Sequence, residues 1–160
     1  MDCTPEDIYK LLESIKDPEI PVLSLVDLGI IKNVVIADDQ VRVTITPTFV
    51  GCPALDTMRS EIETTLLEKG IGHVSVEVSF REPWTSDSLS EKGRIALKKY
   101  GLAPPPQDVL ITDLDILENA ECPRCSGRNT ELRSAFGSTL CRSIHYCRDC
   151  RESFEQFKPL

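Results

Sequence analysis

The sequence predicts an α+β fold in which helices pack on one face of a small sheet, followed by a C-terminal zinc-ribbon module. Apolar residues alternate with polar ones in two stretches, at 30–46 and 74–80, which indicates strands. Apolar stripes with helical spacing stand before, between and after them. Two Cys-x-x-Cys pairs lie near the C-terminus. A length of 160 residues fits one domain with a small added module.

The first helix is predicted to begin after Thr4. Thr4 suits the N-cap, Pro5 suits the first helical position, and Asp7 completes a capping-box-like pattern. An apolar stripe follows, formed by Ile8, Leu11, Leu12 and Ile15. Pro18 ends this helix, and the rigid turn Asp17-Pro18-Glu19-Ile20-Pro21 holds two carboxylates close together. Ordinary turn chemistry also accounts for Asp17 and Glu19.

A hairpin of two strands, 30–36 and 41–46 with a turn at 38–39, is predicted to lead the chain to Cys52. Gly51 permits a positive φ, and Pro53 suits the first position of a helix, which places Cys52 at or near the N-cap. A thiol there feels the positive end of the helix dipole, which favours the thiolate that binds soft metals. The alternative is a small buried residue that only fills a turn.

The remaining elements follow in order. The helix after Pro53 presents Leu55, Met58, Ile62 and Leu66 on one face, and Gly70 ends it. A strand at 74–80 and a helix at about 90–100, ended by Gly101, complete the first domain. Residues 103–106 are proline-rich. We therefore expect a first domain at 1–102, a linker at 103–121 and a zinc ribbon at 122–160.

The C-terminal cysteines indicate a metal site. Cys122 and Cys125 can chelate an ion from one knuckle, and Cys147 and Cys150 from a second, giving four thiolates in a tetrahedron. Such a closed site is structural, and zinc is the expected ion, although iron uses the same ligands. Cys141 and His145 are two further candidates, either as replacement ligands or as spare reactive groups, but the spacing of His145 fits a solvated strand position better.

Charge and composition narrow the possible partners. Residues 1–121 carry 11 Lys/Arg and 22 Asp/Glu, a net charge of −11, and residues 122–160 carry 7 and 4, a net of +3. An acidic body with a mildly basic tail is poor evidence for nucleic-acid binding and suits docking on a protein. The sequence has no signal-peptide pattern and no apolar run of membrane-spanning length. We therefore expect a cytoplasmic protein with no membrane contact and with reduced cysteines.

Both halves of the chain resemble known proteins. The first half resembles the small domain of SufT-type iron–sulfur assembly and carrier proteins through the motifs Asp17-Pro18-Glu19-Ile20-Pro21, Asp27-Leu28-Gly29, Thr46-Pro47-Thr48 and Gly51-Cys52-Pro53. The tail resembles the zinc-ribbon end of the PaaD family through Cys122-Pro123-Arg124-Cys125, Phe136-Gly137-Ser138-Thr139, Cys141, Cys147 to Cys150 and Phe154 to Pro159. One departure is Val50, where a serine is common in the family.

The resemblance implies an accessory role without catalysis in phenylacetate degradation. PaaD-like proteins accompany the oxygenase and reductase of the phenylacetyl-CoA ring 1,2-epoxidase and are thought to mature their metal centres. By this resemblance, Cys52 would hold iron or a transient iron–sulfur cluster, with Asp17 and Glu19 nearby as polar neighbours or partner contacts. A single thiolate cannot retain a cluster, so a homodimer or the client must complete the ligands. Two alternatives are a structural oxygenase subunit in which Cys52 only packs and, less favoured, a thiol enzyme for which no base is evident.

Overall fold

A computed structural model describes residues 3–37, 40–107 and 120–158. The chain divides into two compact units, one through Trp84 and one from Thr85 onward. The helix near residues 90–100, which we place in the first domain from the sequence, groups with the second unit in this division. The linker predicted at 103–121 lies largely at 108–119, outside the described residues.

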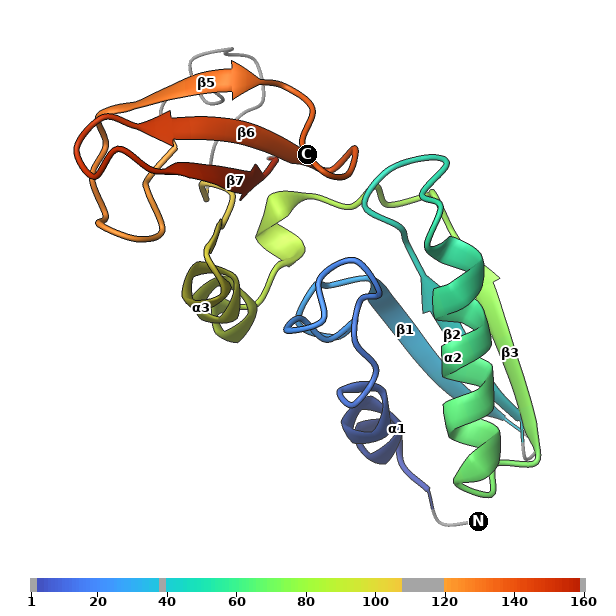
Figure 1. The fold of residues 1–160 in the computed structure, drawn as a ribbon. Coiled ribbons are helices and arrows are strands. Elements are labelled where there is room, and N and C mark those ends of the chain that lie inside the picture. Colours follow the sequence, from blue (N-terminus) through green and yellow to red (C-terminus); the bar gives the residue numbers. More distant parts are fainter. Residues whose placement is uncertain (1–2, 38–39, 108–119, 159–160) are drawn as a thin grey trace. The chain divides into compact units, whose positions relative to one another are not determined.

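The first unit contains a sheet of three strands, β1 (Ile31–Ala37), β2 (Gln40–Ile45) and β3 (His73–Val78), in the order β1-β2-β3. β1 and β2 are antiparallel, which confirms their predicted pairing, and their turn at 38–39 lies outside the described residues. β2 and β3 run parallel because α2 (Leu55–Glu68) crosses between them (Figure 1). Thus the chain leaves β2 at Ile45 and enters α2 through the segment that contains Cys52.

Helices pack on one face of this sheet, as the sequence predicts. α2 contacts β3, and α1 (Pro5–Leu12) packs on both α2 and β1. The core between them is fully buried and includes Ile8, Leu12, Val43, Met58, Ile62 and Leu66. The opposite face is polar, and Arg42 and Glu77 form an exposed ion pair of 3.3 Å on it. This alternation between an apolar and a polar face is what the period of two in β1, β2 and β3 predicts.

Two local hydrogen-bond sets position the first unit's loops. The predicted capping box is confirmed: the Asp7 backbone N–H donates to Thr4 Oγ1 (3.3 Å), and the Thr4 backbone N–H donates to Asp7 Oδ2 (3.2 Å). Near the unit's end, the buried indole of Trp84 donates from Nε1 to the Leu28 carbonyl at 2.7 Å. That bond holds the turn at Gly29, whose φ is +74°.

The second unit joins helical elements to a four-stranded sheet. A short 3₁₀ helix, η1 (Ser86–Ser88), precedes α3 (Glu91–Tyr100), which ends at Gly101 in the left-handed conformation as predicted. The sheet order is β4-β7-β6-β5, with β4 (Leu102–Ala103), β5 (Thr130–Ser134), β6 (Arg142–Cys147) and β7 (Ser153–Phe157). β5, β6 and β7 are antiparallel and form the ribbon, whereas β4 pairs parallel to β7.

The pairing of β4 changes how the proline-rich segment is understood. Composition alone places Ala103 at the start of a linker, but Ala103 pairs with Gln156 and is 1% exposed. Ala120, the first described residue after the gap, is also buried in the ribbon's apolar cluster. Short strands of two residues carry no periodic signal, so the sequence could not reveal this one. In the described part of the chain, no helix has the length and apolar character of a membrane span.

Candidate functional site

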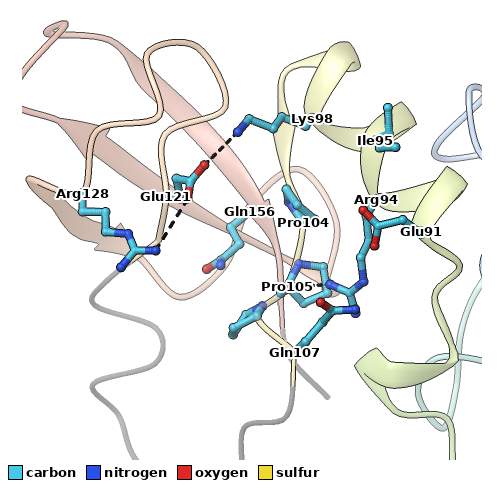
Figure 2. Close-up of a pocket in the computed structure, with 11 residues that line it drawn as sticks. Glu91, Arg94, Ile95, Lys98, Pro104, Pro105, Gln107, Glu121, Arg128 and Gln156 are labelled. Carbon is cyan, nitrogen blue, oxygen red and sulfur yellow. Dashed lines mark hydrogen bonds and ion pairs between the residues drawn. The ribbon is translucent and has the colours of Figure 1, made fainter.

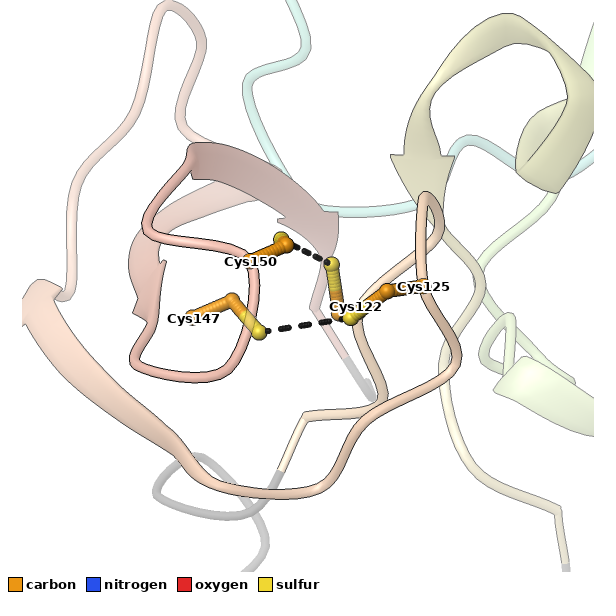
Figure 3. A group of neighbouring side chains, drawn as sticks. All are labelled: Cys122, Cys125, Cys147 and Cys150. Carbon is orange, nitrogen blue, oxygen red and sulfur yellow. Dashed lines mark hydrogen bonds between the residues drawn. The ribbon is translucent and has the colours of Figure 1, made fainter.

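Four thiols gather at the base of the ribbon (Figure 3). The Sγ atoms of Cys122, Cys125, Cys147 and Cys150 all lie within 4.8 Å of one another. Cys122 Sγ is 3.7 Å from Cys150 Sγ, and Cys125 Sγ is 3.6 Å from Cys147 Sγ. A tetrahedral ion with metal–sulfur bonds of about 2.3 Å requires sulfurs about 3.8 Å apart. The four thiols therefore fit a metal ion with all positions filled by protein.

The two knuckles that supply these thiols have equivalent backbones. In each one, the first cysteine's N–H donates to the carbonyl five residues later, from Cys122 to Gly127 at 3.0 Å and from Cys147 to Glu152 at 2.9 Å. The residue after each second cysteine has a positive φ, 58° for Ser126 and 61° for Arg151. This conformation is uncommon for residues other than glycine, so the tertiary contacts of each knuckle must impose it.

The thiols of the cluster differ in acidity. The backbone N–H of Cys150 donates to Cys147 and lowers the pKa of the Cys147 thiol to about 7. Burial raises the pKa of the Cys150 thiol to about 12. Four thiolates at this spacing would repel one another in the absence of a cation, so metal binding must displace protons from the set.

Gly127 makes room for the second knuckle. A Cβ at Gly127 would clash with the Asp149 carboxylate and would lie 3.2 Å from Cys125 Sγ. The Gly127 backbone N–H also donates to Cys125 Sγ at 3.4 Å, and Asp149 accepts from the Asn129 side chain at 3.2 Å. Sequence reasoning did not identify Gly127, although a glycine two residues after a Cys-x-x-Cys pair is a usable signal for a tight knuckle.

Cys141 and His145 lie outside the cluster of four. Cys141 is buried on the ribbon, and its Sγ is 3.1 Å from Thr139 Oγ1. The expectation that His145 is a solvated strand residue is wrong, because its side chain is 0% exposed. It stacks on Phe154 with ring centroids 5.4 Å apart, and Nε2 lies 2.9 Å from Ser143 Oγ. Burial lowers the pKa of His145 to about 4, so it is a neutral part of the ribbon core.

Cys52 lies at the N-terminal end of α2, although the helix begins later than predicted. The helix starts at Leu55 with Ala54 as its N-cap, and Pro53 belongs to the preceding turn. The turn is closed by the Leu55 N–H, which donates to the Cys52 carbonyl at 3.2 Å. Gly51 has the predicted positive φ, +87°. The Cys52 side chain is 8% exposed, so it stands at the end of the helix but under cover.

The Asp17 carboxylate organises its own turn. Asp17 Oδ1 accepts the backbone N–H groups of Glu19 and Ile20, each at 2.8 Å, and the side chain is 6% exposed. Asp17 also lines a cavity of about 420 Å³ with Glu61 and Thr65 of α2, and neither Glu19 nor Cys52 is among the lining residues. This carboxylate therefore fixes the backbone of the turn, while Glu19 is half-buried beside it.

The second unit has a cavity of about 600 Å³ between α3 and the proline-rich segment (Figure 2). Arg94 is 6% exposed, and its guanidinium donates to the carbonyls of Pro105 (2.5 Å) and Ser86 (2.6 Å). Lys98 donates to Glu121 at 2.7 Å on the cavity's rim. Sequence reasoning missed this arrangement because Arg94 looks like a solvated helix residue. Its two carbonyl partners make it a clamp for the chain on both sides of α3.

Comparisons with known proteins match each half separately. Residues 5–80 match the family described as "Iron-sulfur cluster assembly protein", and residues 107–158 match "PaaD zinc beta ribbon domain". A putative subunit of the 1,2-phenylacetyl-CoA epoxidase from Escherichia coli (strain K12) is 37% identical over 152 residues, covering 95% of this chain and 91% of that protein. The "Fe-S protein maturation auxiliary factor" of Porphyromonas gingivalis (strain ATCC BAA-308 / W83) is 39% identical over 99 residues, 59% of this chain and 90% of that protein.

A solved structure agrees with the first half. The crystal structure of a domain of unknown function, DUF59, from Bacillus anthracis has a TM-score of 0.55 at 27% identity and covers 57% of this chain and 89% of its own. The resemblance found in the sequence motifs is thus confirmed over both halves. The chain belongs to the PaaD family, in which an iron–sulfur cluster assembly domain is joined to a PaaD zinc β-ribbon.

Proposed function

We propose that this chain is an accessory protein of the phenylacetyl-CoA ring 1,2-epoxidase that helps to mature the metal centres of the enzyme and is not itself an enzyme. The observation that carries the proposal is the presence of both family halves in one chain that aligns along nearly its whole length with a putative epoxidase subunit. Shorter relatives that match only the first half are named as Fe-S protein maturation factors. The first unit would then perform the maturation step, and the ribbon would direct it.

Cys52 is the residue proposed to hold iron or a transient iron–sulfur cluster as cargo. It stands at the end of α2, where backbone N–H groups favour a thiolate, and Gly51 sets the turn. Because one thiolate cannot retain a cluster, a second copy of the chain or the client must supply other ligands. Asp17 and Glu19 are retained in the proposal as polar neighbours or partner contacts, and Asp17 would act through the turn that it holds.

The ribbon is proposed to bind one zinc ion for structural reasons. Four cysteines leave no open position for a substrate, and the sulfur spacings fit the bond lengths of zinc. The ribbon's own apolar cluster is small, so metal binding would supply much of its folding free energy. Reduced thiols in all seven positions suit the cytoplasm, where we place the protein.

One observation favours a second candidate function. The Cys52 side chain is only 8% exposed, as expected if it merely packs. In that case the chain would be a structural or docking subunit of the oxygenase complex. The two functions differ in whether the thiol is needed for metal transfer.

The test is anaerobic purification and iron–sulfide reconstitution of wild type, Cys52→Ala and Cys141→Ala, followed by transfer to the epoxidase's oxygenase and reductase components. Cys141 is the matched control because it is also a buried cysteine outside the four-thiol cluster. We expect Cys52→Ala to lose labile iron and transfer while keeping about one zinc, and Cys141→Ala to keep both. Unchanged iron uptake and transfer in Cys52→Ala, with normal thermal stability, would exclude the carrier role.

A further inference from the structure

The loop between β5 and β6, residues 135–141, presents two large apolar side chains. Phe136 is 66% exposed and Leu140 is 58% exposed. Single exposed apolar residues are common, but these two lie four positions apart on one short loop. The metal site is formed by the knuckles and does not use this loop. The loop's apolar side chains are therefore not accounted for by metal binding.

The loop is held by the carboxylate of Glu155 on β7. Glu155 accepts the Ser138 backbone N–H at 2.6 Å, the Ser138 hydroxyl at 3.1 Å and the Arg142 guanidinium at 3.0 Å. Burial acts to raise the pKa of Glu155, but the bonds from Ser138 and Arg142 outweigh it and hold that pKa below its usual value. Charge-assisted bonds of this kind are the stronger ones. The centre of the loop is thus fixed to the sheet by an ionised group.

Backbone contacts hold the rest of the loop. The Gly137 N–H donates to the Arg142 carbonyl at 2.8 Å, and the Lys158 N–H donates to the Cys141 carbonyl at 2.9 Å. Lys158 Nζ also donates to the Ala135 carbonyl at 3.2 Å. A Cβ at Gly137 would lie 2.7 Å from Glu155 Oε1 and 2.9 Å from Arg142 Cβ, so only glycine fits. The bonds at Ala135, Gly137 and Cys141 leave Phe136 and Leu140 displayed on a preorganised backbone.

The surroundings of the loop are cationic. Lys158 Nζ lies 5.2 Å from the centre of the Phe136 ring, and the Arg133 side chain, just before the loop, is 58% exposed. The negative charge of Glu155 is already paired with Arg142. Residues 122–158 carry seven Lys/Arg and four Asp/Glu. A surface that complements the loop therefore needs an apolar pocket for the two side chains and acidic groups around it.

We propose that Phe136 and Leu140 dock the ribbon into an apolar, acid-rimmed pocket on the protein that receives the metal. The inference rests on the proposed function in taking that protein to be the oxygenase or the reductase component of the epoxidase. Because the loop is already ordered, docking costs little conformational entropy, and two apolar anchors can supply most of the binding energy. The contact is directed by a place on the ribbon distinct from Cys52.

The test measures binding of each purified epoxidase component to the zinc-loaded full chain by calorimetry. The variants are Phe136→Ala with Leu140→Ala and, as a matched control, Ile95→Ala with Tyr100→Ala, which removes two exposed apolar side chains from α3 of the same unit. We expect the loop variant to bind about tenfold or more weakly, with zinc content and thermal stability unchanged, and the control to bind as wild type. Higher salt should weaken wild-type binding.

Equal binding by the loop variant and wild type would overturn the docking proposal, as would absence of binding by wild type. A wild-type chain that dimerises through the loop, and becomes monomeric in the loop variant, would also overturn it by identifying a second copy as the occupant. Salt-independent binding would overturn the acidic rim. Failure of the maturation role is distinguishable, because it is measured by metal transfer in Cys52→Ala, whose loop is intact.

A second variant tests preorganisation without removing either anchor. Gly137→Ala forces a Cβ against Glu155, whereas Gly72→Ala adds one with nothing within 4 Å. We expect Gly137→Ala to weaken binding several-fold while Gly72→Ala leaves it unchanged. Undiminished binding by Gly137→Ala would overturn the contribution of the fixed loop.

Discussion

Cys122 Sγ and Cys150 Sγ lie 3.7 Å apart, although 28 positions of sequence separate them. The other short sulfur contact, between Cys125 and Cys147, also joins one knuckle to the other. Each close pair therefore bridges the two halves of the site, and a metal ion there ties the ribbon's beginning to its β6–β7 turn. Loss of the ion should affect the ribbon as a whole and leave the first unit folded.

Removal of metal provides the first prediction. A strong chelator should collapse the amide signals of β5, β6 and β7 in NMR spectra, while the fluorescence of Trp84 in the first unit stays unchanged. Lower pH should make removal easier because protons compete for the thiolates. Dispersed β6 signals in a fully metal-free sample would contradict this expectation.

Gly127→Ala should weaken metal binding. The added Cβ meets the Asp149 side chain and approaches Cys125 Sγ, so either the carboxylate or the knuckle has to move. We expect a loss of about tenfold in affinity, similar to changes in the outer shell of metal sites, measured by competition with a chromophoric chelator. Gly72→Ala serves as the control, and equal affinities in the two variants would mean that Asp149 moves freely.

Thr4→Ala should destabilise the first unit by about 1 kcal/mol, the usual value of an N-cap. The hydrogen bond from Thr4 lowers the pKa of Asp7, so the capping box stabilises fully above the ordinary carboxyl pKa and loses its effect as pH falls through the lowered value. Urea unfolding followed by Trp84 fluorescence should show the difference at pH 7 and a smaller one at acidic pH. A difference that does not change with pH would argue against the Asp7 half of the box.

Trp84→Phe should destabilise the first unit by about 1–3 kcal/mol, because the buried Leu28 carbonyl loses its donor. Urea unfolding followed by circular dichroism measures the change. Val35→Ala, at a partly exposed position on the same unit's polar face, should cost less. A Phe variant as stable as wild type would show that water replaces the indole.

Much of the fold follows from local patterns. The capping box at Thr4 and Asp7, the hairpin of β1 and β2, and the stop at Gly101 each depend on residues close in sequence, and each was predictable. The four cysteines were predictable because chelation spacing is itself local. These features need no knowledge of tertiary packing.

Other features depend on distant contacts. His145 has the composition of a surface strand residue, and only packing on Phe154 shows that it is buried. The start of α2 moved from Pro53 to Leu55 because Cys52 closes a turn with its carbonyl, which sequence does not distinguish from a helical bond. The pairing of Ser138 with Glu155 joins residues seventeen positions apart, and nothing in either one's neighbours indicates it.

The parallel pairing of β4 with β7 has a practical consequence for dissecting this protein. A fragment that begins at residue 120 would contain all four cysteines but would lack Leu102 and Ala103, which cover one side of β7. Its β7 would become an open edge strand with unpaired N–H and C=O groups, and such edges recruit other chains into aggregates. A well-behaved excised ribbon should therefore start before α3, at about residue 85.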